Sequence, residues 1–143
     1  MTDETKPSGA RRRHGRVLVV DDEPALGRAL QQVLSRDNEV VVTTDASAAL
    51  VRLLAGEWYD VVLCDVMMPD MDGIEFHRRL SASMPEEADR IVFITGGALT
   101  VHAAAFFDRA PNLLLQKPLD LEGIGALIAR RVLGEAVRGR VAG

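Results

Sequence analysis

The chain has 143 residues, of which 48% are hydrophobic, so it can build one folded domain with a substantial core but not two. The net charge is −4 at pH 7; residues 1–16 contain five basic and two acidic side chains, which leaves 12 basic and 19 acidic residues (−7) for the rest. This excess of acid argues against nucleic acid as the main partner. No apolar stretch approaches the roughly 18 to 20 residues of a membrane span. Cys64 is the single cysteine, so no internal disulfide can form. We therefore expect a soluble, cytoplasmic protein.

The N-terminal segment, residues 1–15, is rich in polar residues, Pro and Gly and shows no periodicity. This composition predicts a disordered, basic tail. The cluster Arg11-Arg12-Arg13-His14-Gly15-Arg16 either contacts an acidic partner or is simply solvated. We expect the folded domain over residues 16–138 and a short C-terminal tail over residues 139–143.

Five short apolar runs begin near residues 17, 40, 61, 91 and 113 and predict five strands. Successive runs start 23, 21, 30 and 22 residues apart, so each gap has room for one crossover helix, which parallel neighbours require. The runs lack polar alternation, which is typical of strands covered on both faces. The pattern predicts a three-layer α/β sandwich with five strands and five helices.

Apolar residues recur at helical spacing between these runs. Pro24 suits the first turn of the first helix, because its missing N–H would have no partner there. The predicted core-facing stripes are Leu26, Leu30, Val33 and Leu34; then Leu50, Leu53 and Leu54; and finally Leu121, Ile124, Leu127, Ile128 and Val132.

Four of the five apolar runs lead directly into a polar residue. The first is followed by Asp21-Asp22, the third by Asp65, the fourth by Thr95 and the last by Lys117. The carboxyl ends of parallel strands lie along one edge of a sheet, where such sheets bind their ligands. We therefore expect three carboxylates, a hydroxyl and an ammonium to converge there.

Such a cluster has a predictable chemistry. Two like charges about 4 Å apart repel by roughly 4 kcal/mol at an effective dielectric near 20, so a bound cation would relieve the acids. Ligands that are all oxygen favour a hard ion such as Mg²⁺, which commonly binds carboxylates, waters and a phosphate. Asp65 is the best candidate for a nucleophile that forms an aspartyl-phosphate. Lys117 and Thr95 would then stabilise the phosphoryl oxygens.

Residues 16–133 resemble the receiver domain of two-component response regulators. The resemblance rests on the acidic pair Asp21-Asp22, on the segment Asp-Val-Met-Met-Pro-Asp-Met-Asp-Gly over residues 65–73, on Thr95-Gly96 and on Lys117-Pro118. It implies a flavodoxin-like fold with a five-stranded parallel sheet in the order 2-1-3-4-5. It also implies that Lys117-Pro118 is a cis peptide bond, which is otherwise uncommon.

The same resemblance implies a role for each site residue. Asp65 would be the phosphoacceptor, Thr95 the switch hydroxyl and Lys117 the partner of the phosphoryl group. Asp21, Asp22, Asp65 and the backbone carbonyl of Met67 would bind Mg²⁺. The implied function is to take a phosphoryl group from a histidine kinase or a phosphotransfer protein and to switch a surface that binds a downstream protein target. Such a domain is not a turnover enzyme on external substrates. A receiver of a hybrid histidine kinase, and a homodimer, are both left open.

The chain departs from the receiver pattern at three places. Leu114 stands where receivers often carry an aromatic residue on the last strand, so the usual aromatic relay is in doubt. Met67 and Gly97 offer no side chain that would orient a water by a strong hydrogen bond, which predicts a moderately long-lived phosphoryl state. Gly96-Gly97 predicts a mobile loop from Thr95 to Leu99.

Other interpretations compete with this one. Asp22 before Pro24 could simply cap a helix. A haloacid-dehalogenase type of phosphatase also uses an aspartyl-phosphate, but needs an acid where this chain has Met67. A flavodoxin-like flavin protein needs Gly, Ser and Thr donors after the first strand. A phosphorylation-independent interaction module is a further alternative. Cys64 is expected in the core, and His77 and His102 at surface or boundary positions.

Overall fold

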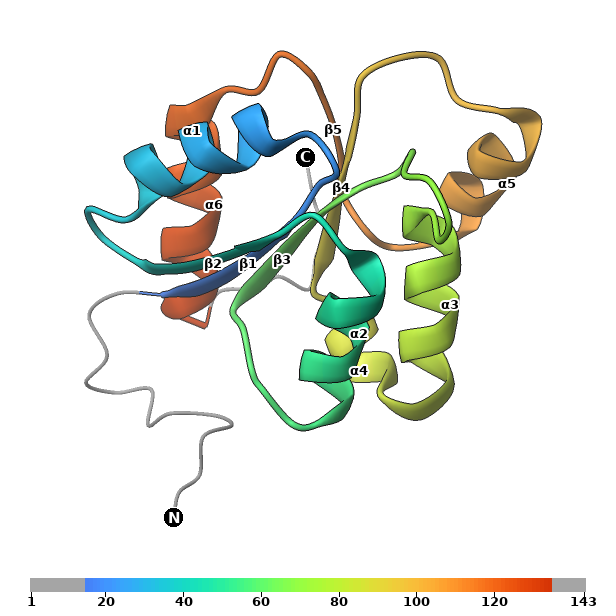
Figure 1. Ribbon diagram of the computed structural model, residues 1–143, viewed down its shortest axis with the longest axis horizontal. Coiled ribbons are helices and arrows are strands. Elements are labelled where there is room, and N and C mark those ends of the chain that lie inside the picture. Colours follow the sequence, from blue (N-terminus) through green and yellow to red (C-terminus); the bar gives the residue numbers. More distant parts are fainter. Residues whose placement is uncertain (1–14, 135–143) are drawn as a thin grey trace.

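Five parallel strands form a single sheet in the order β2-β1-β3-β4-β5, as predicted. The computed structural model describes residues 15–134. The strands are β1 (Arg16–Val20), β2 (Glu39–Thr43), β3 (Val61–Asp65), β4 (Ile91–Thr95) and β5 (Leu114–Gln116). The helices are α1 (Pro24–Leu34), α2 (Ala46–Leu54), α3 (Gly73–Ser83), α4 (Pro85–Ala88), α5 (Val101–Arg109) and α6 (Leu121–Val132). Figure 1 shows α1 and α6 on one face of the sheet and α2, α3, α4 and α5 on the other.

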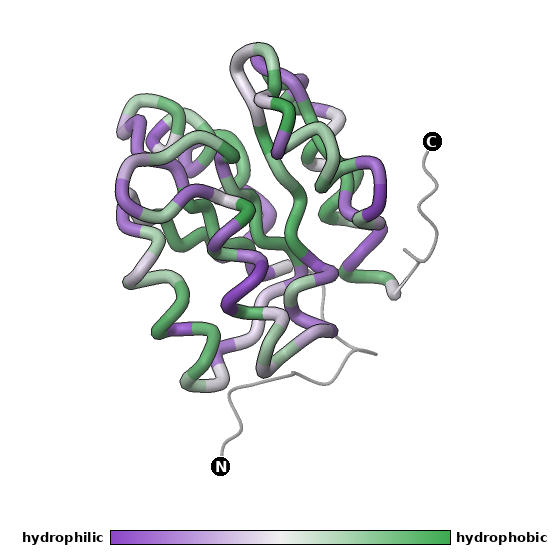
Figure 2. Tube along the Cα trace, turned by 90° about the vertical axis from the view of Figure 1, so that its right-hand side faces the viewer, coloured by the Kyte–Doolittle hydropathy of each residue, from purple (hydrophilic) through white to green (hydrophobic). Residues whose placement is uncertain are grey.

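The sheet separates two hydrophobic cores, because successive side chains of a strand point to opposite faces. Val17 and Val19 of β1 pack with buried residues of α1 and α6, whereas Leu18 and Val20 pack with those of α2 and α3. Figure 2 shows hydrophobic residues along the strands, which run between helices that contain both hydrophilic and hydrophobic residues. Burial on both faces explains why the strands read as uninterrupted apolar runs.

Short polar side chains begin three of the helices. Asp45, Asp72 and Thr100 each accept a hydrogen bond from a backbone N–H of the first turn, at 2.9, 2.9 and 3.0 Å. The start of α1 is different. Pro24 lies in its first turn, as predicted, but the residue at the N-cap is Glu23, whose side chain makes no capping hydrogen bond. The interpretation of Asp22 as a helix cap is therefore wrong.

The structure corrects several details of the prediction. A sixth, short helix, α4, begins at Pro85 and occupies the longest gap between strands. Asp65 and Thr95 are the last residues of their strands rather than the residues that follow. Val33 and Leu54, expected on core-facing stripes, are 39% and 46% exposed. Residues 1–14 and 135–143 lie outside the described residues; they include the predicted C-terminal tail, the predicted end of the domain and all of the predicted N-terminal tail except Gly15. Gly15 is buried, and its N–H donates a hydrogen bond to Asn38 Oδ1 at 2.9 Å.

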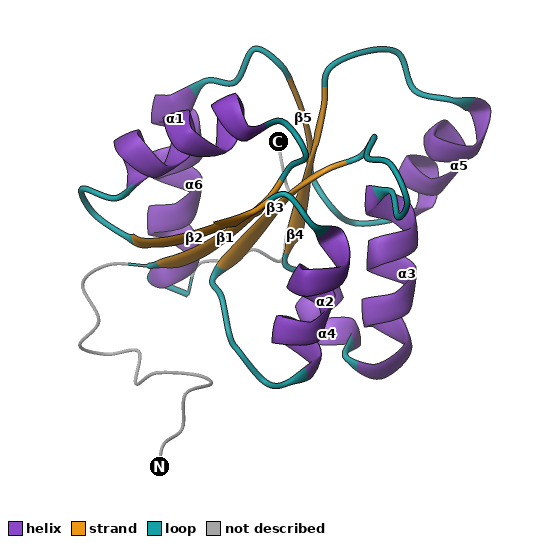
Figure 3. Ribbon diagram, viewed as in Figure 1, coloured by secondary structure: helices purple, strands orange, loops and turns teal. Residues whose placement is uncertain are grey.

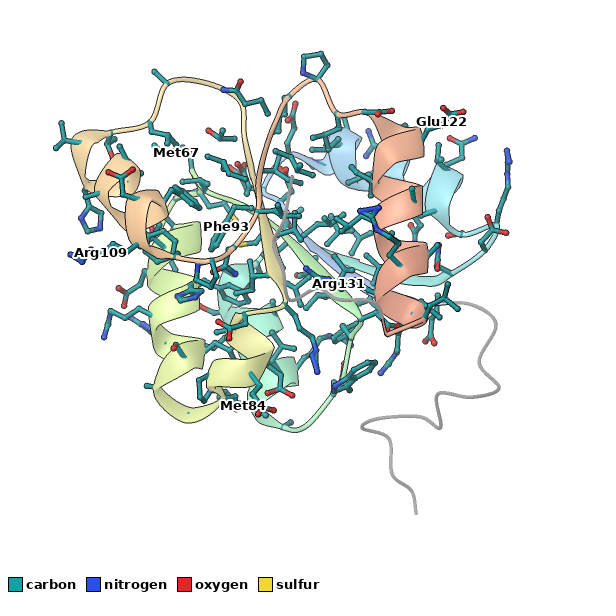
Figure 4. The ribbon with its side chains drawn as sticks, turned by 180° about the vertical axis from the view of Figure 1, so that it is seen from behind. Met67, Met84, Phe93, Arg109, Glu122 and Arg131 are labelled. Atoms are coloured by element: carbon teal, nitrogen blue, oxygen red, sulfur yellow. The ribbon has the colours of Figure 1, made fainter. Side chains whose placement is uncertain are left out.

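An aromatic cluster holds α5 against the rest of the protein. Phe93 of β4 is fully buried, and its ring lies 5.7 Å from that of Phe106 and 5.1 Å from that of Phe107 in near-perpendicular contacts. The ring of His77 lies 5.0 Å from that of Phe106. Figure 4 shows Phe93 in the interior between α3 and α5. His77 is half-buried and His102 exposed, in line with boundary and surface positions, and Cys64 is buried in the core.

Two glycines should respond in opposite ways to alanine. A Cβ at Gly73 would meet the backbone oxygen of Asp65 at 2.5 Å, whereas a Cβ at Gly125 within α6 would meet nothing within 4 Å. Gly73→Ala should therefore destabilise the fold by about 1–3 kcal/mol, because backbone must move. Gly125→Ala should stabilise the fold by about 0.5–1 kcal/mol, because alanine has a higher helix propensity than glycine. Urea denaturation of both variants checks this, and a Gly73→Ala midpoint equal to the parent's would contradict it.

Candidate functional site

The predicted polar residues gather at the carboxyl edge of the sheet. Asp21 directly follows β1, Asp65 ends β3, Thr95 ends β4 and Lys117 directly follows β5. In the sheet, β3 lies between β1 and β4 (Figure 3). Asp65, the last residue of β3, is therefore in the middle of this group. The local sequence determines which residue ends each strand, and the sheet order determines which ends become neighbours.

The three acids form one cluster. A carboxylate oxygen from each of Asp21, Asp22 and Asp65 lies within 4.8 Å of the others. Asp21 is fully buried; its Oδ1 accepts a hydrogen bond from the Glu23 N–H at 2.8 Å, and its Oδ2 accepts none among the described residues. Asp65 is 5% exposed, and its Oδ1 accepts a long hydrogen bond from the Met67 N–H at 3.4 Å. Asp22 is exposed to solvent.

Burial makes the charged forms of the two inner acids costly. Burial, and then repulsion from Asp21, raises the pKa of Asp65 to about 6, although Lys117 opposes the shift. Burial also raises the pKa of Asp21 above its usual value. The pKa of Lys117 is raised as well: its partial burial lowers it, but the charges of Asp21 and Asp65 outweigh that effect. The acids therefore need more positive charge than one lysine supplies.

This donor set fits a hard divalent cation. All the side-chain donors are carboxylate oxygens, and the buried Oδ2 of Asp21 has no hydrogen-bond donor among the described residues. The neighbouring thiol of Cys64 is fully buried and contacts the Asp65 backbone oxygen instead. Mg²⁺ is commonly bound by one or two carboxylates together with waters and a phosphate. Met67 lies two residues after Asp65, and its backbone N–H donates to Asp65 Oδ1, so the main chain of Met67 lies at the same cluster.

Mg²⁺ binding should depend on pH through Asp65. A carboxyl must lose its proton to bind a metal, so the affinity should fall by up to tenfold per pH unit below about 6. We expect roughly tenfold weaker binding at pH 5 than at pH 7 in calorimetric titrations with MgCl₂. Asp65→Asn should bind Mg²⁺ more weakly at pH 7 and show a smaller change between the two pH values. Equal affinity of the parent at pH 5 and pH 7 would contradict the prediction.

Lys117 contacts three carboxylates rather than Asp65 alone. Its Nζ lies 3.3 Å from Glu23 Oε1, 3.6 Å from Asp21 Oδ2 and 4.0 Å from Asp65 Oδ2. The Lys117-Pro118 peptide bond is cis, as the resemblance implied. Sequence reasoning missed Glu23 as a member of the site, although it stands third in the acidic run Asp21-Asp22-Glu23.

The Thr95 side chain lies at the site but is engaged elsewhere. Thr95 is 1% exposed, and its hydroxyl donates to the backbone carbonyl of Gly97 at 3.3 Å. The end of β4 adjoins Asp65 through a hydrogen bond from the Val66 N–H to the Ile94 carbonyl at 2.9 Å. The hydroxyl would therefore have to exchange its loop partner for a group attached to Asp65. The predicted mobility of the loop from Thr95 to Leu99 stays a prediction.

The family described as "Response regulator receiver domain" matches residues 17–129, which include every site residue discussed above. The chain belongs to this family. Receivers are the phosphoacceptor modules of two-component signalling and work with histidine kinases; they are not turnover enzymes. This membership favours the receiver interpretation over the phosphatase and flavin-protein alternatives.

The chain is similar to parts of several kinds of protein. Over 72 residues it is 42% identical to a protein-glutamate methylesterase/protein-glutamine glutaminase of Hahella chejuensis; these residues make up 49% of this chain and 20% of that protein. Over 113 residues it is 30% identical to the response regulator ArlR of Staphylococcus haemolyticus, covering 78% of this chain and 50% of ArlR. The chain thus spans between a fifth and a half of these curated relatives.

Solved structures agree with the fold. The CheY-like receiver from Methanospirillum hungatei matches with a TM-score of 0.71 at 24% identity, covering 83% of this chain and 94% of that one. The receiver domain of a histidine kinase from Syntrophus aciditrophicus matches with a TM-score of 0.67 at 21% identity, covering 90% of this chain and 97% of that one.

None of the helices within residues 15–134 of the present chain has the length and apolar character that a membrane span requires.

Proposed function

We propose that Asp65 accepts a phosphoryl group from a histidine kinase or a phosphotransfer protein. Asp21, Asp22, Asp65 and the Met67 backbone carbonyl would hold Mg²⁺, which supplies positive charge to the phosphoryl oxygens when bound. The observation that carries the proposal is the position of Asp65 in the middle of the site, with two acids beside it and the Lys117 ammonium 4.0 Å away.

The three acids are not equivalent as nucleophiles. Asp21 is fully buried, and its Oδ1 is held by the Glu23 N–H, whereas Asp22 is exposed away from the protein interior. Asp65 retains a little exposure and faces Lys117 through its Oδ2. It is therefore the acid best placed both to meet a donor and to have its product stabilised.

The reaction is a phosphoryl transfer between two side chains. An oxygen of Asp65 forms a bond to phosphorus, the bond from phosphorus to the donor histidine breaks, and the released imidazole takes a proton from solvent. Lys117 would neutralise one phosphoryl oxygen. Thr95 would turn its hydroxyl from the Gly97 carbonyl to another oxygen. Positioning and charge neutralisation are the main requirements of such a transfer.

The change at Thr95 would reach the surface through α5. The loop after β4 leads into α5, which buries only Ala103 completely and otherwise depends on its aromatic contacts. A helix with so few buried residues can change position at modest cost. We propose that this movement alters the surface that a downstream protein target, or a second copy of the receiver, recognises. A receiver domain over residues 16–138, flanked by tails, and a cytoplasmic location are parts of the same proposal.

Intact-mass measurement after incubation with acetyl phosphate and Mg²⁺ tests the proposal. The parent should gain the mass of one phosphoryl group, and Asp65→Asn should gain none. Glu122→Gln, which removes an exposed acid from α6 (Figure 4), is the matched control and should react like the parent. A parent that neither gains this mass nor responds to beryllofluoride would favour a phosphorylation-independent interaction module.

The lifetime of the phosphoryl group is a separate prediction at Met67. This side chain is 54% exposed, two residues beyond Asp65, and its thioether cannot orient water by a strong hydrogen bond. Met67→Asn should shorten the lifetime of the phosphorylated protein several-fold, because an amide can hold the attacking water. Met67→Leu is the control and should keep the parent's decay, followed by intact mass over time. An unchanged lifetime in Met67→Asn would show that this position does not govern hydrolysis.

A further inference from the structure

Glu23 is an acid at the site that neither the proposed metal set nor the phosphoryl chemistry uses. Its Oε1 accepts a hydrogen bond from the Lys117 Nζ at 3.3 Å, a shorter distance than the 4.0 Å between that nitrogen and Asp65 Oδ2. The metal-type cluster of carboxylate oxygens contains Asp21, Asp22 and Asp65 but not Glu23. Its side chain has no capping role either, although it stands at the N-cap of α1.

The backbone of Glu23 is fixed, which gives its side chain a defined reach. Its N–H donates to Asp21 Oδ1 at 2.8 Å, and its carbonyl accepts from the Leu26 N–H at 3.2 Å. The carboxylate itself is 59% exposed, whereas the Lys117 side chain is only 25% exposed. The ammonium therefore lies nearest to the outermost of its three partners.

We propose that Glu23 is a positioning residue that holds the Lys117 ammonium away from Asp65 until a phosphoryl group is present. This inference rests on the proposed function of Asp65. Glu23 thereby acts as a competitor: it stabilises the resting protein and opposes the contact between Lys117 and the new phosphoryl oxygen.

Simple electrostatics gives the direction and size of the effect. A phosphoryl group carries between one and two negative charges, so it attracts Lys117 more strongly than one carboxylate does. To bind it closely, the ammonium must leave Glu23 or draw that anion toward another anion. An exposed ion pair contributes about 0.2–1 kcal/mol, which corresponds to a factor of roughly 1.4 to 5 in an equilibrium constant. Loss of the Glu23 contact should favour the phosphorylated state by that factor.

Two substitutions separate the contact from the charge. Glu23→Gln removes both the negative charge and the ion pair. Glu23→Asp keeps the charge but is one methylene shorter, and an Asp at the N-cap turns its carboxylate toward the first-turn N–H groups. Both variants lose the ion pair with Lys117, whereas only Gln changes the charge. Glu122→Gln, an acid outside the described ion pairs of Lys117, is the control for removing one negative charge.

The experiment is a beryllofluoride titration of the full chain at saturating Mg²⁺, followed by the amide NMR signals of Thr95 and Gly96. We expect Glu23→Gln and Glu23→Asp both to bind beryllofluoride 1.4 to 5 times more tightly than the parent, and Glu122→Gln to match the parent. In a Lys117→Gln background the gain from Glu23→Asp should vanish, which a purely structural role of Glu23 would not produce.

The outcomes distinguish this inference from the function beneath it. If Glu23→Asp binds beryllofluoride with the parent's affinity, whether or not Glu23→Gln binds more tightly, the proposed competition between Glu23 and the phosphoryl group is overturned. Weaker binding by both variants would mean that Glu23 assists binding, and would overturn the proposal as well. If the parent binds no beryllofluoride and behaves like Asp65→Asn, the proposed phosphoacceptor function fails, and the role of Glu23 fails with it.

Discussion

The Asp65→Asn protein should unfold at a higher urea concentration than the parent in Mg²⁺-free buffer at pH 7.5. The pKa of Asp65 is raised from 3.8 to about 6 by burial and by the charge of Asp21, so folding carries a penalty once this carboxyl ionises. A shift of this size corresponds to at most about 3 kcal/mol. Asparagine has no charge to bury and can still accept the Met67 N–H.

The sign of the pH dependence follows from the direction of this shift. For a carboxyl whose pKa is raised in the folded state, the favourable contribution is fully present below the unfolded pKa near 3.8. It is lost as the pH rises through about 6. The difference in unfolding free energy between Asp65→Asn and the parent should therefore be largest above pH 7 and disappear near pH 4. Mg²⁺ should reduce this difference at pH 7.5, because it should stabilise the parent more than Asp65→Asn. Equal urea midpoints in Mg²⁺-free buffer at pH 7.5 would show that Asp65 does not strain the metal-free fold.

Phe93→Ala is expected to be a strongly destabilising core substitution on the α5 side of the sheet. The ring is fully buried and contacts those of Phe106, Phe107 and His77. Truncation leaves a cavity and removes the main contact of α5 with β4, so the free energy of unfolding should fall by about 3–5 kcal/mol. Urea denaturation measures this loss.

Hydrogen exchange shows whether the damage is local to α5. In Phe93→Ala, amides of residues 101–109 should lose more protection than those of α6, which packs on the other face of the sheet. Phe93→Leu is the matched control, because it keeps most of the volume and should cost clearly less. A loss below about 1 kcal/mol in Phe93→Ala would mean that the aromatic cluster does not anchor α5.

Much of the fold could be predicted because its signals are local. Each strand is a short apolar run, because burial on both faces removes polar alternation. The strands near Val17 and Ile91 can therefore be predicted from the sequence without knowing which strands they pair with. Pro24 marked the start of α1 for an equally local reason. The small helix α4 escaped prediction because Pro85–Ala88 is too short to show a helical period.

The sequence by itself determined which residues could take part in the site: the acids after β1 and at the end of β3, Thr95 at the end of β4 and the lysine after β5. Parallel strands put their carboxyl ends on one edge of the sheet, so residues at those ends could be expected at the same edge. Only the tertiary structure decided how those neighbours pair. Glu23 and Lys117 are 94 residues apart and meet at 3.3 Å, and the Thr95 hydroxyl points to Gly97 rather than to Asp65. The spacing of apolar residues indicates where a strand or helix ends and which of its faces is buried. Contacts between long or exposed side chains depend on the sheet order, the strand register and the competing partners, and no local sequence pattern contains that information.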